Sequence, residues 1–405
     1  MKRPVVFIIK QFLLFLTLMI VVGLAMAIIF FPQPVFQAAL RGLNAWLEIV
    51  IPALLPFFII SQLFISLGIV HFLGVLLEPI MRPLFNVPGN GAFVMAMGYT
   101  SGAPISAMIT AQLRQKQMIT RVEGERLICF TNNASPLFML GAVAVGMLHN
   151  PALGPILACA HYSANFCLGI LLRFYGKNDL NSPSTSYSLL TLPKRAWQSM
   201  ILAQQKNIRP LGQLLGDAVS QSFQTLITIG GFIILFSVII QVVDTLGLLK
   251  TIAKFFQFIC IPLGLNPDSC IALAGGLFEM TMGTKFISET AIPLRQQMVA
   301  ISLIMGWAGL SIIGQVAAMI SKTDLRLGPF IISRIFHGFL AAIIVQFLQG
   351  PAKPVIMMLP HSRMVSSSYL SLWLQYIGFP LFIMIIFIII GVITLITNRF
   401  IYRRP

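Results

Sequence analysis

Long apolar runs alternate along the chain with short segments that carry basic residues. The runs long enough to cross a bilayer core of about 30 Å as helices are residues 5–31, 45–68, 127–148, 152–172, 218–243, 298–320, 327–348 and 370–396. Two less hydrophobic runs, 71–85 and 246–263, contain charged residues and are typical of helices that lie at the membrane interface. The pattern predicts an all-helical protein with many membrane spans.

Two apolar stretches, 88–136 and 267–309, are interrupted by Gly, Pro, Ser and Thr, and the first also by Asn, which an ordinary membrane-spanning helix avoids. Each begins with a candidate hairpin, 88–113 and 267–293. Backbone that leaves a helix at membrane depth is tolerated only where protein or a water-filled cavity satisfies it. Interrupted segments of this kind point to the binding site of a transporter. Arg82 and Arg114 flank residues 88–113, so we expect this segment to enter and leave the membrane on one side, as a re-entrant hairpin rather than a full span.

The two halves of the chain share three short matches in the same order and at nearly the same offset. Residues 73–76 match 246–249, residues 137–144 match 310–317, and residues 153–155 match 327–329. Because each half holds three spans, an odd number, we expect the second half to be inverted in the membrane. The predicted fold is therefore an all-α polytopic membrane protein with two inverted repeats, each with three spans and a re-entrant helical hairpin, plus an N-terminal and a C-terminal flanking helix.

This organisation predicts five segments of the chain. They are an N-terminal membrane helix and outer loop (1–43), a first repeat (44–174), a cytoplasmic linker (175–215), a second repeat (216–349), and an outer loop with a C-terminal membrane helix (350–405). The basic flanks place both termini in the cytoplasm.

Composition and charge narrow the class of protein. Hydrophobic residues make up 57% of the chain and charged residues only 9%, which excludes an ordinary soluble domain. The net charge of +16 fits the positive-inside bias of short loops, and we expect no nucleic-acid partner. The five cysteines form no CxxC motif, so no disulfide or zinc site is predicted. No catalytic triad or P-loop motif is found, which argues against an enzyme and against an ATP-driven pump.

Polar residues inside the interrupted stretches are the candidate substrate-binding residues. Thr100 and Ser101 lie at the expected turn of the first hairpin; Asn132, Asn133 and Ser135 follow in the next span; Glu279, Thr284 and Lys285 lie in the second interrupted stretch. Amides and ionisable groups in a membrane need partners, and they are functional candidates by default. The structural alternatives are close helix packing at the serine and threonine, backbone capping by the asparagines, and an internal salt bridge between Glu279 and Lys285.

Three motifs resemble one known family. The stretches GYTSGAP, ITRVEGERLICFTNNASPLFMLGAVAVGML and GGLFEMTMGTKFIS are similar to the YlbJ family of sporulation integral membrane proteins, which belongs with the nucleoside-recognition or Gate domain proteins. The resemblance covers about residues 45–350. It implies a carrier-like membrane protein of endospore-forming bacteria, with the site at Thr100, Ser101, Asn132, Asn133, Glu279 and Lys285. One family member, the stage V sporulation protein, is linked to dipicolinic acid uptake across the outer forespore membrane.

Residues and resemblance together predict a secondary transporter or facilitator of a small organic anion, with dipicolinic acid as the substrate. A nucleoside carrier and a non-transporting membrane scaffold are the alternatives. We expect no cofactor beyond a coupling proton or sodium ion, and the partners are a small anionic substrate and the lipid bilayer, with a homo-oligomer left open. The expected location is the cell membrane or the outer forespore membrane.

Overall fold

The computed structural model describes residues 2–176, 191–205 and 209–349, and every regular element within these ranges is a helix. Five helical runs in them are long and apolar enough to cross a membrane: Pro32–Phe64, Leu153–Leu172, Leu211–Thr245, Leu294–Ile320 and Leu327–Leu348. The expectation of an all-helical membrane protein is confirmed. The expected C-terminal span, 370–396, lies outside the described residues, as does the whole segment 350–405.

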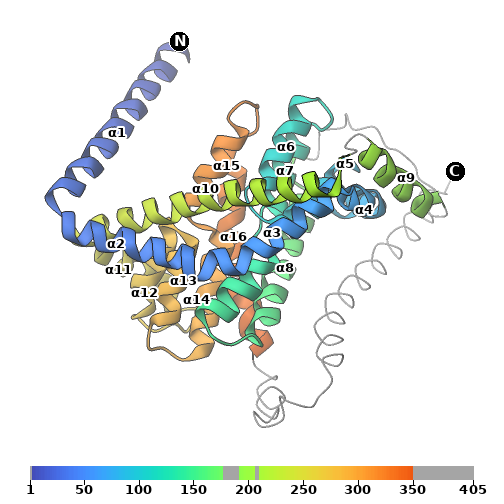
Figure 1. Ribbon diagram of the computed structural model, residues 1–405. Coiled ribbons are helices and arrows are strands. Elements are labelled where there is room, and N and C mark those ends of the chain that lie inside the picture. The colour runs from blue at the N-terminus through green and yellow to red at the C-terminus, as the bar shows by residue number, and fades with distance from the viewer. Residues whose placement is uncertain (1, 177–190, 206–208, 350–405) are drawn as a thin grey trace, which may run out of the picture.

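The N-terminal part of the chain is a series of helices, two of which pack on α10. Helix α1 (Lys2–Phe30) is followed by α2 (Pro32–Asn44), the π-helix η1 (Ala45–Val50) and α3 (Ile51–Ser66). The outer loop expected within 1–43 is helical, because the prolines of α2 stand in its first turn, where a missing N–H costs no hydrogen bond. Both α2 and α3 pack on α10 (Leu211–Thr245), which crosses the middle of the molecule (Figure 1).

The rest of the first half consists of a helix expected at the interface, a hairpin, a broken helix and a span. These are α4 (Ile69–Phe85), the hairpin α5 (Asn90–Ser101) with α6 (Ile105–Gln115), the broken helix α7 (Arg121–Thr131) with the π-helix η2 (Phe138–Met147), and α8 (Leu153–Leu172). At a rise of about 1.5 Å per residue, neither α5 nor α6 exceeds about 18 Å, which is too short to cross a bilayer core.

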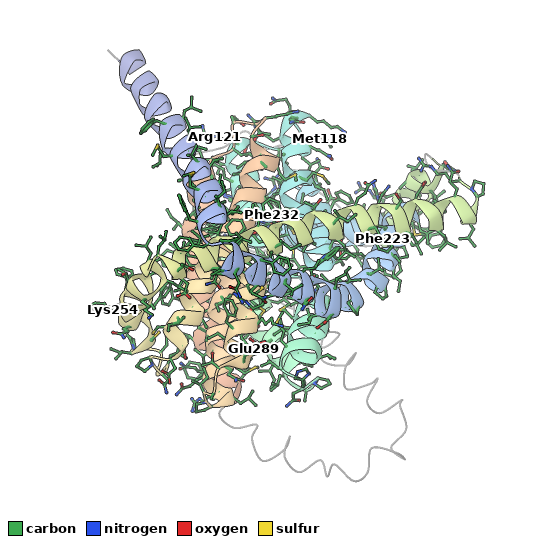
Figure 2. The ribbon with its side chains drawn as sticks, turned by 60° about the vertical axis from the view of Figure 1, so that its left-hand side comes forward. Met118, Arg121, Phe223, Phe232, Lys254 and Glu289 are labelled. Atoms are coloured by element: carbon green, nitrogen blue, oxygen red, sulfur yellow. The ribbon has the colours of Figure 1, made fainter. Side chains whose placement is uncertain are left out.

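The second half repeats this order of elements. After α10 come α11 (Leu248–Cys260), the hairpin α12 (Ser269–Phe278) with α13 (Met280–Glu289), the broken helix α14 (Leu294–Trp307) with α15 (Gly309–Ile320), and α16 (Leu327–Gln349). Met118 and Arg121 follow the first hairpin and Glu289 ends the second, and Figure 2 places them at opposite ends of the molecule. The two hairpins therefore approach the centre from opposite sides, while their inverted placement in a membrane stays a prediction.

The expected span 127–148 is not one continuous helix. Helix α7 ends at Thr131 and residues 132–135 are not helical. Pro136 explains the break, since it lacks an N–H and disfavours helical backbone at the preceding Ser135. The span 298–320 is interrupted too, at Ala308, whose φ of 71° lies in the left-handed region.

The linker between the halves contains structure that the sequence reading did not anticipate. Within the segment 175–215, helix α9 (Leu192–Gln205) packs against α4. Gly68, at the N-terminus of α4, has a φ of 74°, and an added Cβ there would lie 2.7 Å from the carbonyl oxygen of Met200. This close approach fixes α9 against the first half. The run 181–188, expected as a flexible linker, lies outside the described residues.

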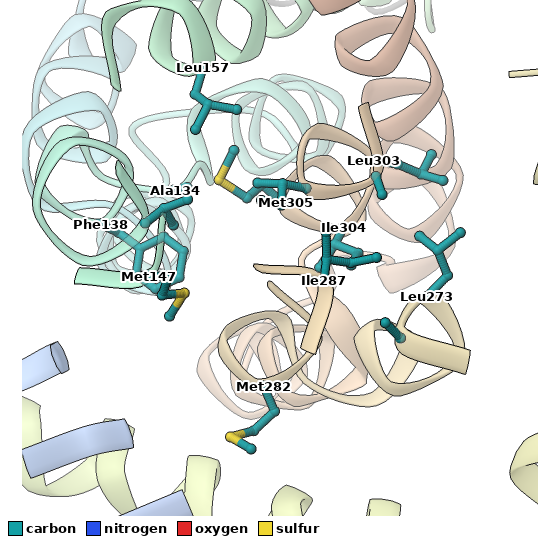
Figure 3. Close-up of a cluster of buried hydrophobic side chains, with 14 of the residues drawn as sticks. Ala134, Phe138, Met147, Leu157, Leu273, Met282, Ile287, Leu303, Ile304 and Met305 are labelled. Atoms are coloured by element: carbon teal, nitrogen blue, oxygen red, sulfur yellow. The ribbon is translucent and has the colours of Figure 1, made fainter. Parts of the chain in front are cut away.

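The two halves share one hydrophobic core. Its largest cluster includes Phe138 and Met147 of η2, Leu157 of α8, and Ile304 and Met305 of α14. Figure 3 shows these side chains gathered between the first-half and second-half helices. Helix α16 extends this contact because it packs on both α8 and α14. Burial on this scale makes the halves one structural unit.

A buried carboxylate links the halves at the end of the molecule near Arg121. Glu125 of α7 has a fully buried side chain and accepts hydrogen bonds from Arg326 Nε at 2.8 Å and Nη2 at 2.9 Å. Arg121 Nε donates to Glu125 at 3.0 Å, and the Tyr175 hydroxyl donates at 2.6 Å. Arg326 precedes α16, so this cluster joins the start of α7 to the second half.

Candidate functional site

A cavity lies where the hairpin turns meet the helix breaks. The first half contributes the turn Ser101, Gly102, Ala103 and the break Asn133, Ala134, Ser135. The second half contributes the turn Glu279, Met280, Thr281, the break residue Ala308, and Ser311, Ile312 and Gln315 of α15. The remaining lining residues come from η1, α3, η2 and α10: Val50, Leu54, Phe58, Phe138, Ile229, Phe232 and Ile233. The cavity is therefore polar at the helix ends and apolar along the crossing helices.

The first hairpin turn is bound directly to the first break. The N–H of Ala103 donates to the carbonyl of Asn133 at 2.8 Å, and the Ser106 hydroxyl donates to Asn132 Oδ1 at 3.0 Å. Gly98 permits this approach, because an added Cβ would lie 2.1 Å from the carbonyl oxygen of Thr131. Gly102 has a φ of 79°, a conformation that favours glycine.

The second hairpin turn is bound to the second break in a comparable way. Trp307 Nε1 donates to the carbonyl of Leu277, near the end of α12, at 3.0 Å. Gly309 has a φ of 83°, and an added Cβ there would lie 3.0 Å from the carbonyl oxygen of Phe278 and 3.1 Å from Glu279 Cα. Only glycine fits this position without a shift of the turn.

Side chains from α8 and α16 hold the first break from behind. Arg334 of α16 is fully buried, and it donates to the carbonyl of Asn132 at 2.9 Å and to that of Cys129. His161 of α8 accepts the N–H of Ala134 through Nε2 at 3.3 Å, and Asn165 donates to the carbonyl of Phe130. The carbonyls at the end of α7 would otherwise lack partners. A guanidinium at this helix C-terminus also matches the negative end of the helix dipole.

Glu279 is both a helix cap and a cavity residue. It precedes α13, its side chain is largely buried, and its Oε2 accepts the N–H of Met282 at 2.6 Å. The sequence places it there because an acceptor at the N-cap satisfies a free N–H of the first helical turn. Among the cavity-lining residues that the structure describes, Glu279 alone has an acidic or basic side chain.

Two other helices begin at the cavity without a side-chain cap. Neither Pro104, which precedes α6, nor Ala308, which precedes α15, makes a capping hydrogen bond from its side chain. The first N–H groups of such a helix have no partner within the helix, and they carry a partial positive charge. By contrast, the Ser135 hydroxyl accepts the N–H of Phe138 at 3.2 Å at the start of the helix that becomes η2.

Four of the predicted site residues line the cavity and four do not. Ser101, Asn133, Ser135 and Glu279 line it, and the buried Oδ1 of Asn133 has no hydrogen-bond partner among the described residues. The other four do not line it. The Thr100 hydroxyl donates to the carbonyl of Ala96 at 2.8 Å, and Asn132 Oδ1 accepts from Ser106. Thr284 is fully buried within α13, and Lys285 Nζ lies 3.5 Å from Glu289. The expected contact between Lys285 and the site is not seen, nor is a salt bridge between Lys285 and Glu279.

The sequence reading missed three polar residues that line the cavity: Thr281, Ser311 and Gln315. A signal for two of them was present. Ser311 and Gln315 are the polar positions, four residues apart, of the otherwise apolar stretch 310–317 that matches 137–144. Residues at this spacing share one helix face, and Gln315 Nε2 donates to the Ser311 hydroxyl at 3.4 Å. In the described ranges no group of three or more His, Cys, Asp and Glu residues could hold a metal ion.

Comparisons with known proteins find a matching family, a relative of similar sequence and solved structures of lower similarity. The Gate family, described as nucleoside recognition, matches residues 47–176 and 226–326. The sporulation integral membrane protein YlbJ of Bacillus subtilis (strain 168) is 44% identical over 344 residues, which cover 85% of this chain and 82% of YlbJ. A structure of CNTnw in an inward-facing substrate-bound state gives a TM-score of 0.48 at 10% identity, with 85% of each chain covered. A CNTnw variant in an intermediate state gives 0.47 at 12% identity, covering 85% of this chain and 86% of the other.

Proposed function

Because the chain belongs to the family of sporulation integral membrane proteins that includes YlbJ, and because it contains a Gate domain, we propose that it is a secondary transporter or facilitator of a small organic anion. The resemblance that its sequence motifs indicated is confirmed, and the chain is an integral membrane protein of a transporter-like kind. The substrate that we propose is dipicolinic acid, carried during spore formation across the cell membrane or the outer forespore membrane.

The observation that carries this proposal is the pair of uncapped helix starts at the cavity. The N-terminus of α6 comes from the first half and that of α15 from the second, and neither has a side-chain cap. Helix N-termini bind anions through free N–H groups and the helix dipole. Two such ends at one cavity suit a small molecule with two carboxylates.

The lining side chains supply the remaining contacts of this proposal. Ser101 and Ser135 offer hydroxyls, and Asn133 Oδ1, which has no hydrogen-bond partner among the described residues, offers an acceptor for a donor group of a ligand. Phe58 and Phe232 give apolar faces for a planar ring. Lys285 is assigned no substrate contact, because it is paired with Glu289 and does not line the cavity.

Glu279 is the proposed site of the coupling ion. An ionised carboxylate beside an anionic substrate repels it, so uptake of a proton by Glu279 would favour substrate binding. This gives a reason for a transporter of anions to keep one acidic residue in an otherwise uncharged cavity. A sodium ion held by the same carboxylate would have a similar effect on charge.

A nucleoside-type carrier is the second candidate, and a specific observation favours it. Phe58, Phe138 and Phe232 all line the cavity together with Asn133 and Glu279. Stacking rings combined with amide and carboxylate acceptors would suit a nucleobase and a ribose. The third candidate is a non-transporting scaffold. Deletion of residues 181–188 separates it from a transporter, because the deletion should abolish the function of a scaffold and leave a transporter largely active.

The test is uptake of labelled dipicolinate into vesicles that contain the purified protein. Uptake that is faster than in empty vesicles and is stimulated by a proton gradient supports the proposal, whereas stimulation by a sodium gradient assigns the coupling ion to sodium. Competition by excess unlabelled dipicolinate, with no competition by uridine or adenosine, separates the anion from the nucleoside. Uptake of nucleosides but not of dipicolinate would overturn the proposed substrate. Absence of uptake of both compounds would favour the scaffold.

A further inference from the structure

Two cysteines face each other at the joint between α11 and α12. Cys260 is the last residue of α11 and Cys270 is the second residue of α12, and their sulfur atoms lie 2.7 Å apart. Each residue is only 1% exposed. The other three cysteines lie elsewhere, Cys129 on α7 and Cys159 and Cys167 on α8.

Hydrogen bonds order the connection between the two helices and so hold the two cysteines close together. The N–H of Leu265 donates to the carbonyl of Cys260 at 2.9 Å, and the N–H of Cys270 donates to the carbonyl of Pro267 at 2.9 Å. The N–H of Asn266 donates to Gln296 Oε1 of α14 at 3.0 Å, which ties the connection to the next helix. The two sulfurs therefore meet because an ordered turn brings them together, and a bond of about 2.05 Å needs a movement of less than about 1 Å.

We propose that Cys260 and Cys270 form a disulfide that fixes the base of the second hairpin to α11. The two thiols lose two protons and two electrons as the S–S bond forms. The electrons pass to a disulfide oxidant, which is reduced to a dithiol by thiol–disulfide exchange. The expected orientation of the chain places α11 at the outer side of the membrane, where such oxidants act and disulfides persist.

The cross-link would constrain one end of the hairpin that carries Glu279. Cys270 lies at the start of α12, and Glu279 follows its last residue, so the cross-link fixes the base and leaves the turn at the cavity free. The corresponding connection of the first half, residues 86–89, contains no cysteine. The second hairpin is thus covalently anchored, whereas the first depends on packing and hydrogen bonds alone.

The test measures the oxidation state of the full chain as it occurs in cells. Cells are quenched with acid, dissolved in denaturant with N-ethylmaleimide and no reductant, and the intact protein is weighed by mass spectrometry. The proposal predicts three maleimides, on Cys129, Cys159 and Cys167, and five after reduction. Proteolysis should yield a joined peptide that contains Cys260 and Cys270. Five maleimides without reduction, or a cross-link between other cysteines, would overturn it.

Two variants complete the experiment. Cys167→Ser is the matched control, because it should lower the count from three to two and leave the joined peptide unchanged. The double variant Cys260→Ser/Cys270→Ser should take up three maleimides with and without reduction. Its midpoint of thermal unfolding in detergent should fall by several degrees relative to the unreduced wild type. An unchanged midpoint would contradict the anchoring role.

Discussion

Arg334 donates a hydrogen bond from Nη1 to the main-chain carbonyl of Asn132, at 2.9 Å, and so joins the second half of the chain to the break in the first. The same guanidinium donates to the carbonyl of Cys129 and lies 3.1 Å from His337 Nδ1. It also stacks over Phe330, 5.3 Å from the ring centre. A side chain of α16 thus satisfies carbonyls that α7 leaves open, and the shape of the cavity depends on both halves.

Arg334→Lys is expected to damage both stability and transport. Lysine keeps the charge, but its single ammonium cannot bridge two carbonyls as the planar guanidinium does. Loss of one hydrogen bond to a charged group costs about 1.5–3 kcal/mol, so the thermal midpoint in detergent should fall clearly. Arg295→Lys is the control, because Arg295 is exposed and its replacement should leave the midpoint unchanged. Equal midpoints for both variants would contradict the supporting role of Arg334.

Glu279→Gln is expected to abolish the dependence of uptake on the proton gradient. Glutamine keeps an oxygen that can accept the N–H of Met282, so the helix cap survives while the titrating group is lost. Gradient-driven uptake should fall by about tenfold or more, as expected for loss of an interaction of about 1.4 kcal/mol or more. Glu289→Gln serves as the control, because Glu289 is exposed and lies at the far end of α13. Unchanged coupling in Glu279→Gln would exclude this carboxylate as the proton site.

Gly98→Ala is expected to separate the first hairpin from the first break. The new Cβ would lie 2.1 Å from the carbonyl oxygen of Thr131, and main-chain atoms cannot yield without moving α5 or α7. Overpacking of this kind costs about 1–3 kcal/mol, and uptake should be lost even where the protein reaches the membrane. Gly231→Ala on α10 is the matched control, since nothing lies within 4 Å of its added Cβ. Full uptake by Gly98→Ala would show that the hairpin turn does not need this contact.

Much of the fold could be predicted from the sequence, because long apolar runs and basic loops report directly on a bilayer. Helix breakers in the stretches 88–113 and 267–293 also indicated the hairpins correctly. The break at 132–135 lies within the stretch 88–136 that the helix breakers marked as interrupted, yet residues 127–148 were still read as one span. Apolar periodicity continues on both sides of such a break, so hydropathy alone reads it as one span.

The candidate site could be predicted only in part, because side-chain direction within a short helix depends on its packing. Thr100 and Ser101 are neighbours in sequence, yet Ser101 lines the cavity and Thr100 bonds to its own helix. Lys285 is a second example, because the sixth residue of α13 lies away from the cavity. The role of Arg334 could not be inferred without knowing that α16 packs behind the first break.

Glu125→Gln is expected to destabilise the protein far more than Asp324→Asn. The Glu125 side chain is fully buried among Arg326, Arg121 and Tyr175, so its loss should cost about 2 kcal/mol or more. Asp324 pairs with Arg114 at 2.8 Å but is about half exposed, and such pairs contribute at most about 1 kcal/mol. Thermal midpoints of the two variants provide the measurement, and similar midpoints would contradict the comparison.

The Asp324 pair also predicts a small dependence of stability on pH. The hydrogen bond from Arg114 lowers the pKa of Asp324 below its usual value. The pair therefore stabilises the folded protein above the ordinary pKa of an aspartate, and this contribution is lost as the pH falls through the lowered pKa. Wild type and Asp324→Asn should differ slightly in thermal midpoint at neutral pH and converge in strong acid. A difference that grows on acidification would contradict this sign.

If the two halves are inverted in the membrane, as the sequence predicts, the bases of the two hairpins have opposite accessibility. Gln117 lies in the connection that follows α6 and Ala291 in the connection that follows α13, and both residues are exposed. Cysteine at each position can be labelled in intact cells in the background Cys159→Ser/Cys167→Ser, because the remaining cysteines are buried. A membrane-impermeant maleimide should label Ala291→Cys from outside and Gln117→Cys only after the cells are opened. Labelling of both from one side would mean that the hairpins enter from the same face, and the repeats would then not be inverted.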